Sequence, residues 1–323
     1  MNLLGLRTIG ALPGSWRVRH DAVSPELAKL LYPKVLELAS KGEGPARIAR
    51  QLSAVYQLSI SPGTVRHWVV GDRNPQGGKV RNLFRKEPSP ALSYVIGANI
   101  GDGCTLTDNW IVKLEVTDRD FAEAFNSRMA ELFSRKNPNT ILIKRFRVRR
   151  LPMHVVRYSC KALVELLRLP LKKLLEIAFA FPCEFLRGFY DAEGHVDVGV
   201  SRVLELRIGV DNSDRTLMFE VKHLLTKLNI ASRFERRRKK GTTMLIRGVI
   251  FAKRRNSYSV VIGRNADMRR FASEIGFSIR RKIQKLRDAL SIIDSYEPRR
   301  RPAVWLNLYS KIGGEWVRKA EIG

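Results

Sequence analysis

Two acidic residues, Asp102 and Glu193, follow closely similar glycine-containing runs of the sequence. Residues 95–103 (VIGANIGDG) align without gaps with residues 186–194 (LRGFYDAEG), so each acid has the same place in its copy. Carboxylates suit divalent cations such as Mg²⁺, which also bind phosphate and lower the pKa of a bound water. The pair therefore predicts metal-assisted phosphodiester hydrolysis, provided that the fold brings the two acids together.

Small residues spaced four apart explain how the acids could meet. Gly97 and Gly101 in the first copy correspond to Gly188 and Ala192 in the second, which puts a stripe of small residues on one face of each expected helix. Two such helices can approach almost backbone to backbone. If they run in parallel, both acids emerge at the C-terminal ends, where free carbonyls and the helix dipole favour a cation.

Similar elements follow the two runs, and this repetition predicts two domain-sized halves. Each copy continues with an alternating, strand-like segment, a helical segment, two further strand-like segments and a last helix. The glycines after the acids, Gly103 and Gly194, are expected to end the helices in the left-handed conformation. The expected ranges are 112–117, 120–133, 141–149 and 155–159 in the first copy, and 204–210, 216–228, 232–237 and 257–262 in the second.

The paired glycine–acid helices with strands between them resemble the LAGLIDADG homing endonuclease family over roughly residues 89–290. The resemblance implies an α+β fold in which two pseudo-symmetric αββαββα repeats form a β-saddle over duplex DNA. It implies that Asp102 and Glu193 are catalytic and hold Mg²⁺ or Mn²⁺ together with the main-chain carbonyls of Gly101 and Ala192. We therefore predict a metal-dependent endodeoxyribonuclease that cuts both strands of a long asymmetric target and leaves staggered ends.

Basic side chains on the expected strands predict the DNA-binding face. Alternation along residues 144–149 puts three arginines on one side of a strand, and strands with such side chains can enter a major groove. The run at residues 235–241 is expected to contact phosphates. The resemblance adds a supporting basic shell near Arg119 and Arg215. The predicted residues are Lys113, Glu115, Arg119, Arg145, Arg147, Arg149, Arg207, Arg215, Arg236 and Arg238.

Residues 44–52 and 61–69 predict a small N-terminal helix-turn-helix-like, all-α module. Ser61 is the expected N-cap of the recognition helix and Pro62 its first residue. The alternative is a small helical domain that packs on the enzyme core. We expect Val65, Trp68 and Val69 to pack inward. The residues expected to face DNA are Thr64, Arg66 and His67.

Turn-rich and proline-containing stretches set the expected domain boundaries. Glycine and asparagine cluster at residues 71–78, and two prolines at positions 88 and 90 precede the first motif helix. The expected organisation is the N-terminal module at 1–80, the first repeat at 88–180, the second repeat at 181–290 and a C-terminal extension at 291–323.

The charge balance predicts a polyanionic partner. Lys and Arg number 59 against 31 Asp and Glu, which gives a formal net charge of +28. The basic residues recur along the chain instead of gathering beside an apolar anchor, so we expect double-stranded DNA and no membrane. Three widely spaced cysteines predict a reducing compartment, and the opening residues lack a signal sequence. We expect an intracellular protein, cytoplasmic, nucleoid-associated or organellar.

Two classes of function remain open. One is an intron-encoded homing endonuclease acting as a monomer, because two unequal repeats supply the pseudo-dimer within one chain. The other is a binding protein, either an RNA maturase that helps its host intron RNA fold or a catalytically silent DNA-binding regulator. The retained acid pair favours the enzyme. His195 is expected at the surface or against DNA, and Asp191 at the helix end or helix interface.

Overall fold

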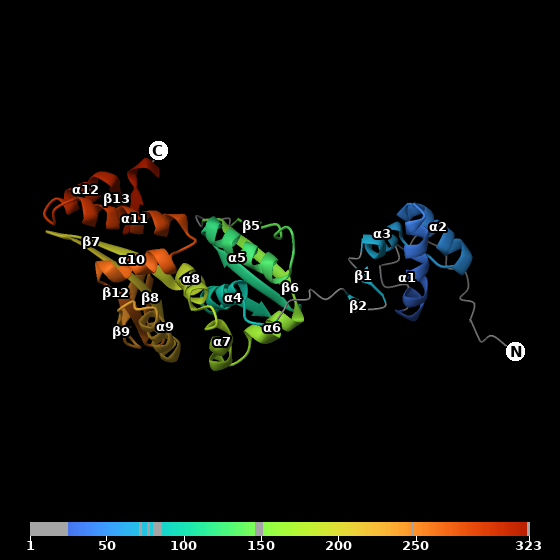
Figure 1. Cartoon of the computed structure of the whole chain (residues 1–323), viewed down its shortest axis with the longest axis horizontal. Coiled ribbons are helices and arrows are strands. Elements are labelled where there is room, and N and C mark those ends of the chain that lie inside the picture. The colour runs from blue at the N-terminus through green and yellow to red at the C-terminus, as the bar shows by residue number, and fades with distance from the viewer. Residues whose placement is uncertain are drawn as a thin grey trace. The chain divides into compact units, whose positions relative to one another are not determined.

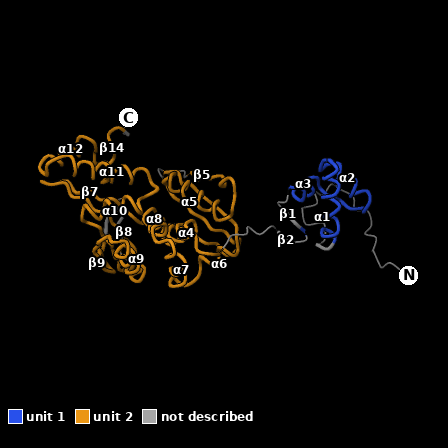
Figure 2. The backbone as a smooth tube through the Cα atoms, in the orientation of Figure 1, with its two compact units in different colours: residues 1–83 blue, residues 84–323 orange. Residues whose placement is uncertain are grey.

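The computed structural model describes residues 25–70, 73–75, 78–79, 86–145, 151–246, 249–252 and 254–321 of the chain. The chain divides into two compact units, residues 1–83 and residues 84–323 (Figure 2). No helix among the described residues is both long and apolar enough to cross a membrane.

The described residues of unit 1 form three helices and a short two-stranded ladder. The core includes Val65 and Trp68, and Ser61 Oγ accepts a hydrogen bond from Thr64 N at 3.0 Å, which confirms the predicted N-cap. Val69 is 38% exposed, so its expected inward packing is wrong. The elements are α1 (Pro25–Ser40), α2 (Pro45–Tyr56), α3 (Pro62–Val70), β1 (Arg73–Asn74) and β2 (Gly78–Lys79), so the unit is not purely helical.

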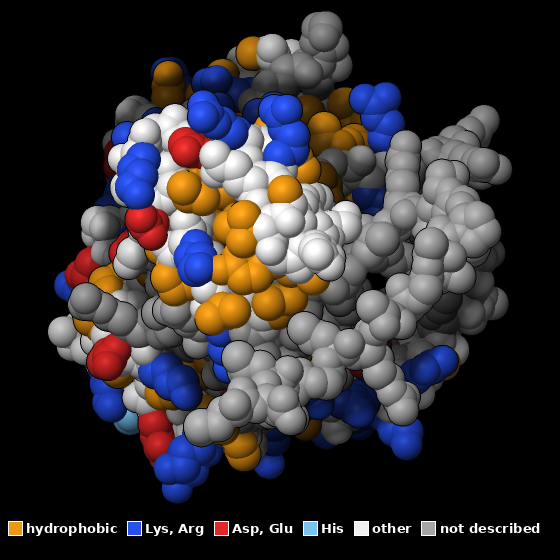
Figure 3. Space-filling view, turned by 90° about the vertical axis from the view of Figure 1, so that its right-hand side faces the viewer, with side chains coloured by type: hydrophobic (Ala, Val, Ile, Leu, Met, Phe, Trp, Pro, Cys, Tyr) orange, Lys and Arg blue, Asp and Glu red, His pale blue; other side chains and the backbone are white. Residues whose placement is uncertain are grey.

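Several large apolar side chains of unit 1 stay exposed, among them Leu30, Val55 and Val70. Figure 3 shows apolar side chains lying among Lys and Arg on the face turned to the viewer. Exposed apolar side chains are ordinary on a protein surface.

Unit 2 contains two halves built on one plan (Figure 1). The first half consists of α4 (Pro90–Gly101), β3 (Gly103–Leu106), β4 (Ile111–Val116), α5 (Arg119–Leu132), β5 (Leu142–Lys144), β6 (Met153–Ser159), α6 (Lys161–Leu167) and α7 (Leu171–Ala178). The second half consists of α8 (Pro182–Glu193), β7 (Gly194–Val200), β8 (Leu204–Asn212), α9 (Arg215–Lys227), β9 (Arg233–Arg238), β10 (Thr243–Ile246), β11 (Val249–Ala252), β12 (Ser257–Ile262) and α10 (Asn265–Glu274).

The two main sheets have the same strand order, β3-β4-β6-β5 and β7-β8-β12-β9, with antiparallel neighbours throughout. In β4 and β8 buried apolar side chains alternate with more exposed polar ones, as the sequence predicts. The predicted α+β fold with two repeats is therefore confirmed. The second half also contains the hairpin β10–β11, which the sequence pattern did not indicate.

The extension after the second half folds against it. Trp305 is fully buried and stacks on Tyr309, with ring centroids 4.0 Å apart, and Trp316 Nε1 donates to Val198 O at 2.8 Å. The expected boundary at residue 290 falls inside one long helix. The elements are α11 (Arg280–Ser295), α12 (Arg301–Leu308), β13 (Tyr309–Ile312), β14 (Glu315–Arg318) and η1 (Lys319–Glu321).

Gly103 and Gly194 begin strands, and neither has a positive φ, so the expected left-handed helix ends are wrong. Each chain segment turns directly from the motif helix into its strand and passes very close to the last helical turn. A Cβ at Gly103 would lie 2.4 Å from Asn99 Cα, and one at Gly194 would lie 2.4 Å from Tyr190 O. Close backbone approach, not left-handed geometry, requires the two glycines.

Candidate functional site

The motif helices α4 and α8 lie side by side at the centre of unit 2 (Figure 1). A Cβ at Gly97 would lie 2.2 Å from Phe185 O, and a Cβ at Gly188 would lie 2.2 Å from Tyr94 O. These contacts are reciprocal, because Tyr94 and Phe185 have the same place in their respective helices. Further along the pair, a Cβ at Gly101 would lie 2.4 Å from Ala192 Cβ, so the contacts advance in the same direction along both helices. The helices are therefore parallel and pack backbone to backbone, as the small-residue stripe predicts.

This packing brings Asp102 and Glu193 to the same end of the helix pair. Asp102 caps α4, and its N–H donates to Ala98 O at 3.0 Å; Glu193 is the last residue of α8. Burial raises the pKa of Glu193, and the charge of Asp102 raises it further. Burial also raises the pKa of Asp102, against the opposing charge of Lys282. A Cβ at Gly101, the residue before Asp102, would lie 3.1 Å from Glu193 Cγ, so the two acids end their helices side by side.

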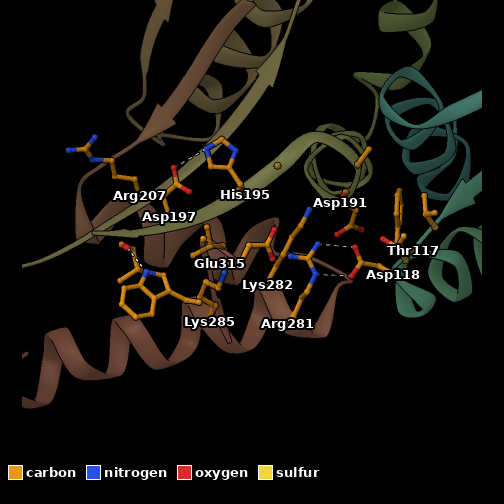
Figure 4. Close-up of a pocket in the computed structure, with 18 of the residues that line it drawn as sticks. Thr117, Asp118, Asp191, His195, Asp197, Arg207, Arg281, Lys282, Lys285 and Glu315 are labelled. Carbon is orange, nitrogen blue, oxygen red and sulfur yellow. Dashed lines mark hydrogen bonds and ion pairs between the residues drawn. The ribbon is translucent and has the colours of Figure 1, made fainter. Parts of the chain in front are cut away.

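The two acids open into different clefts. Asp102 lines a cleft of about 700 Å³ at the junction of the two halves, together with Asp118, Asp191 and Lys282 (Figure 4). Glu193 lines a second cleft of about 420 Å³ with Asp211, Asn212, Ser213, Arg254, Arg255, Asn256 and Ser257. The surroundings of the two acids therefore differ although their helices are equivalent.

Glu193 is oriented by β8. Asn212 Nδ2 donates to Glu193 Oε1 at 3.2 Å, and neighbouring Asp211 forms an ion pair with Arg237 through one carboxylate oxygen. The other oxygen, Asp211 Oδ1, is buried without a hydrogen-bond partner, as is Asn99 Oδ1 near the end of α4. Unsatisfied buried oxygens cost free energy unless a water or a cation binds them.

Lys282 is the functional candidate that the sequence interpretation missed. Its side chain is buried, and Nζ donates to Tyr190 O at 3.0 Å and to Asp191 O at 2.7 Å, at the C-terminal end of α8. Burial lowers the pKa of Lys282 to about 8, with Asp191 opposing the shift. A sequence signal did exist, because Lys282 shares the buried stripe of α11 with Leu286 and Ala289.

The start of α11 is fixed to the first half of unit 2. Arg281 binds Asp118 with two hydrogen bonds of 2.8 and 2.9 Å, and Arg280 N donates to Asp120 Oδ2. Figure 4 shows the Arg281–Asp118 pair beside Lys282, which rises from the same helix toward Asp191. These two contacts, of Arg281 with Asp118 and of Arg280 N with Asp120, hold the Lys282 ammonium at the C-terminal end of α8.

Asp191 lies at the helix interface, as predicted. Its Oδ2 accepts from Tyr94 OH at 2.8 Å across the helix pair, and its Oδ1 accepts from Ser278 N at 2.7 Å. Burial raises the pKa of Asp191 while these bonds lower it. Asp191 therefore joins the two motif helices and the segment that leads into α11.

The oxygen atoms near the helix ends are of the kind that divalent cations prefer. Two carboxylates, the carbonyls of Gly101 and Ala192 and the unpaired Asp211 Oδ1 are hard ligands of the kind that Mg²⁺ and Mn²⁺ prefer. Within the described residues, no group of three or more His, Cys, Asp or Glu side chains could hold a metal. Waters and a substrate phosphate would therefore complete the coordination, as is usual for Mg²⁺.

Many of the side chains predicted to bind DNA are engaged in ion pairs. Lys113 Nζ and Lys144 Nζ both bind Glu115, at 3.0 and 2.8 Å, and Arg207 binds Glu205 at 2.8 Å. Arg119 and Arg215 begin the equivalent helices α5 and α9; the former pairs with Glu123 and the latter lies over the Phe219 ring. The exposed ion pairs among these, Arg119–Glu123 and Arg207–Glu205, are weak and can exchange for phosphate contacts.

The other residues predicted to bind DNA differ in their surroundings, and two of them lie outside the described residues. Arg145 is exposed and lies beyond the end of β5, whereas Arg147 and Arg149 lie outside the described residues. Arg236 is opposite Tyr258, and a register shift next to this pair leaves Arg237 to bind Asp211 on the polar face. Arg238 is opposite Ser257. In unit 1, Arg66 is exposed on α3, with Thr64 and His67 partly exposed on the same helix.

His195 lies on the surface of the second sheet. Its Nε2 is 3.3 Å from Asp197 Oδ2, and a Cβ on Gly209 of the neighbouring strand would be 2.4 Å from the same nitrogen. The imidazole therefore lies across β8 and, with Asp197, lines the same cleft as Asp102 (Figure 4). Its surface position is that expected from the sequence.

Comparison with solved structures gives two groups of similar proteins. A variant of the homing endonuclease I-DmoI is 17% identical, covering 58% of this chain and 95% of that one, with a TM-score of 0.39. I-DmoI in complex with DNA and Mn is 19% identical over 58% of this chain and 96% of that one, with a TM-score of 0.37. Full-length DUF199/WhiA from Thermatoga maritima is 13% identical, covering 70% and 68%, with a TM-score of 0.40.

Comparison of sequences gives the family. The family described as "LAGLIDADG-like domain" matches residues 180–276. A glutamine–fructose-6-phosphate aminotransferase of Methanocaldococcus jannaschii is 22% identical over 64% of this chain, a match that spans only 18% of that enzyme. The uncharacterized protein MJ0398 of the same archaeon is 30% identical over 255 residues, 78% of this chain and 89% of the relative. The chain therefore belongs to the same family as MJ0398, and its second half carries a LAGLIDADG-like domain.

Proposed function

We propose that this protein is a monomeric, site-specific homing endonuclease that hydrolyses both strands of a long asymmetric DNA duplex. The observation that carries the proposal is the reciprocal backbone packing of α4 and α8, which brings Asp102 and Glu193 to one end of the helix pair. Each carboxylate opens into its own cleft, so each can serve one strand. A net charge of +28 supports a polyanionic substrate.

In this mechanism Asp102 and Glu193, with the carbonyls of Gly101 and Ala192, would hold Mg²⁺ or Mn²⁺. When bound there, such a cation would activate a water and stabilise negative charge on the phosphate. Asn212 orients the Glu193 carboxylate, and Lys282 supplies a positive charge beside Asp102. The polar faces of β4 and β8, with Lys113, Glu115, Arg207 and the neighbouring basic residues, bind the duplex. Unit 1 extends the footprint through Thr64, Arg66 and His67.

The test is cleavage of a randomised duplex library in Mg²⁺ by wild type, Asp102→Asn and Glu193→Gln at equal folded concentration. We expect wild type to cut at one long sequence, leaving staggered ends, and both variants to lose double-strand cutting while still binding the target. Glu165→Gln, on the exposed side of α6, is the matched carboxylate control and should cut normally. Tight binding without cutting by wild type would overturn the nuclease and favour a DNA-binding regulator or an RNA maturase.

A further inference from the structure

A third cleft, of about 640 Å³, lies at the outer end of the sheet of the second half and is lined by four arginines. We propose that this arginine cleft binds a backbone phosphate of duplex DNA, on the flank of the target. The inference rests on the proposed function in taking a duplex as the ligand, but it does not require that the protein cuts it.

Strand β8 sets the position of the arginine cleft. Asn212, the last residue of β8, donates to Glu193 Oε1, whereas the first four residues of the strand, Leu204–Arg207, line the cleft. The strand between Glu205 and Asn212 is about 20 Å long at ordinary strand spacing. A duplex with its scissile phosphates at the acids would therefore reach this cleft only along its flank.

Positive charge dominates the lining of the cleft. The charged residues that line it are Arg207, Arg233, Arg264, Arg301 and Glu205. Glu205 binds Arg207 at 2.8 Å, and Arg264 has a long contact of 3.9 Å with Asp267. Arg233 is exposed and has no ion pair within the described residues. Four positive charges against one negative charge favour an anion.

One of the arginines is held in place by the C-terminal extension. Arg301, the first residue of α12, donates to Tyr296 O and to Ile293 O, both at 2.8 Å. These two carbonyls fix the direction of its guanidinium before any ligand binds. A fixed guanidinium loses little conformational entropy when it binds a phosphate oxygen.

Neutral donors lie in the same cleft. Ser232 Oγ is buried and has no hydrogen-bond partner within the described residues. Arg264, the N-cap of α10, makes no capping bond through its side chain, so the first amides of this helix, from Asn265 on, have no acceptor in the helix. A Cβ at Gly263 would have no neighbouring atom within 4 Å, so the cleft is open there. Hydroxyl, amides and guanidinium groups together suit a phosphate.

The first half does not repeat the arginines. The strand registers make Ile111 the counterpart of Arg207, and Cys160, the N-cap of α6, is the counterpart of Arg264. Cys160 N donates to Trp110 O at 2.8 Å. The arginine cluster is therefore not a consequence of the repeated fold. A phosphate contact in one half alone suits an asymmetric target.

The test is binding of a fluorescent random-sequence duplex by the full-length protein at several salt concentrations, with EDTA to prevent cleavage. Arg233→Gln combined with Arg264→Gln should weaken binding roughly tenfold and lower the slope of log affinity against log salt by about 1, the value for one lost phosphate contact. Gly263→Asp adds a carboxylate to the open space and should weaken binding by a similar factor. Ser232→Ala should weaken binding roughly threefold with the net charge unchanged.

Matched controls separate a specific site from the general charge of the protein. Arg168→Gln combined with Arg287→Gln removes two exposed arginines that lie outside this cleft and should weaken binding by less than about twofold. Gly263→Asn has the shape of Gly263→Asp without its charge and should bind like wild type. Thermal unfolding establishes that each variant is folded, and the two Gly263 variants decide the question if the double arginine variant does not fold.

Two results would overturn the inference. One is an equal loss of duplex affinity in the cleft pair and the control pair, and the other is equal binding by Gly263→Asp and Gly263→Asn. Calorimetry with inorganic phosphate tests a free ligand. Phosphate binding that Gly263→Asp abolishes, with duplex affinity unchanged, would replace DNA by a small phosphate compound and overturn the proposal.

Failure of the proposed function looks different. Wild type would then cut no duplex in the library test, while the cleft variants still weaken duplex binding more than the controls do. That result would keep the inference and reject the nuclease. A wild type that cuts its target, with cleft variants that bind the duplex as tightly as the controls, would reject the inference and keep the nuclease.

Discussion

At the residue scale, Asp102 and Glu193 lower the free energy of unfolding when they are ionised and no cation is bound. Burial raises the pKa of Asp102 above its ordinary value of 3.8 and that of Glu193 above 4.5. A raised folded-state pKa means that the folded protein binds the proton more tightly than the unfolded chain does. Ionisation therefore destabilises the fold, fully at a pH above the folded-state pKa and not at all below the unfolded-state value.

Asp102→Asn is accordingly expected to raise the unfolding temperature at about pH 8 in the absence of divalent cations, because it removes a partly buried negative charge. The advantage should shrink as the pH falls through the raised pKa of Asp102 and vanish below its ordinary value. Thermal unfolding followed by circular dichroism across this range measures it. Asp108→Asn, in the exposed turn between β3 and β4, is the control. A difference that stays constant with pH would contradict the prediction.

The sequence predicted the residues whose role follows from local spacing. Asp102, Glu193 and the small-residue stripe were found because each copy of the motif repeats the same pattern. Lys282 was not found, because its role depends on how a helix some ninety residues further along the chain returns to the end of α8. The sequence interpretation named Arg236, and not Arg237, as a DNA-binding residue. The register shift between β9 and β12 sets the direction of the Arg237 side chain, and the sequence pattern does not indicate this shift.

At the element scale, the contact of α4 with α8 leaves no room for added atoms. Gly97→Ala would place a Cβ 2.2 Å from Phe185 O, and Gly188→Ala would place one 2.2 Å from Tyr94 O, so backbone must move in either variant. We expect each to lower the free energy of unfolding by about 3 kcal/mol, the upper part of the range for overpacking. Urea unfolding measures this.

Gly263→Ala is the control for these substitutions, because a Cβ at Gly263 has no atom within 4 Å among the neighbours considered and no positive φ to strain. It should be close to neutral. Comparable losses of stability in Gly263→Ala and Gly97→Ala would mean that helix contact is not the cause.

Elements with strong local patterns were predicted well, and elements set by tertiary packing were not. The alternation that predicts β4 and the first part of β8 is regular because one face of each strand is buried. Of the expected strand at residues 141–149, the structure shows Leu142–Lys144 as an edge strand, and residues 146–149 lie outside the described residues. The long helix α11 crosses the expected boundary at residue 290 because its apolar stripe continues to Ile293.

At the scale of the whole molecule, unit 1 and unit 2 are expected to bind adjacent parts of one target. Arg66→Ala, on the exposed face of α3, should weaken target binding by about 1–3 kcal/mol and shorten the footprint at one end, without moving the cut. Footprinting and a binding titration at fixed salt measure both effects. Lys29→Ala, exposed on α1, is the charge-matched control. A full-length footprint in Arg66→Ala would contradict the prediction.

The charge of the whole chain predicts a polyanionic partner, but it does not indicate how the positive charge is used. Several basic side chains of unit 2, among them Lys113, Lys144 and Arg207, bind acids of the same sheet face. The net charge of the sequence includes these side chains without regard to their acidic partners. The folded register shows their internal partners, which they would exchange for phosphate if a duplex bound this face.

The hydrogen bond between Tyr94 and Asp191 also bears on how such a protein can be recombined. Its mirror-related pair in the helix dyad is Phe185 with Ile100, which is wholly apolar. Two copies of the second half would set each buried Asp191 against a phenyl ring, and two copies of the first would set each Tyr94 hydroxyl against an isoleucine. The two halves are thus complementary at this contact. A chimaera keeps its core only if it combines one first half with one second half.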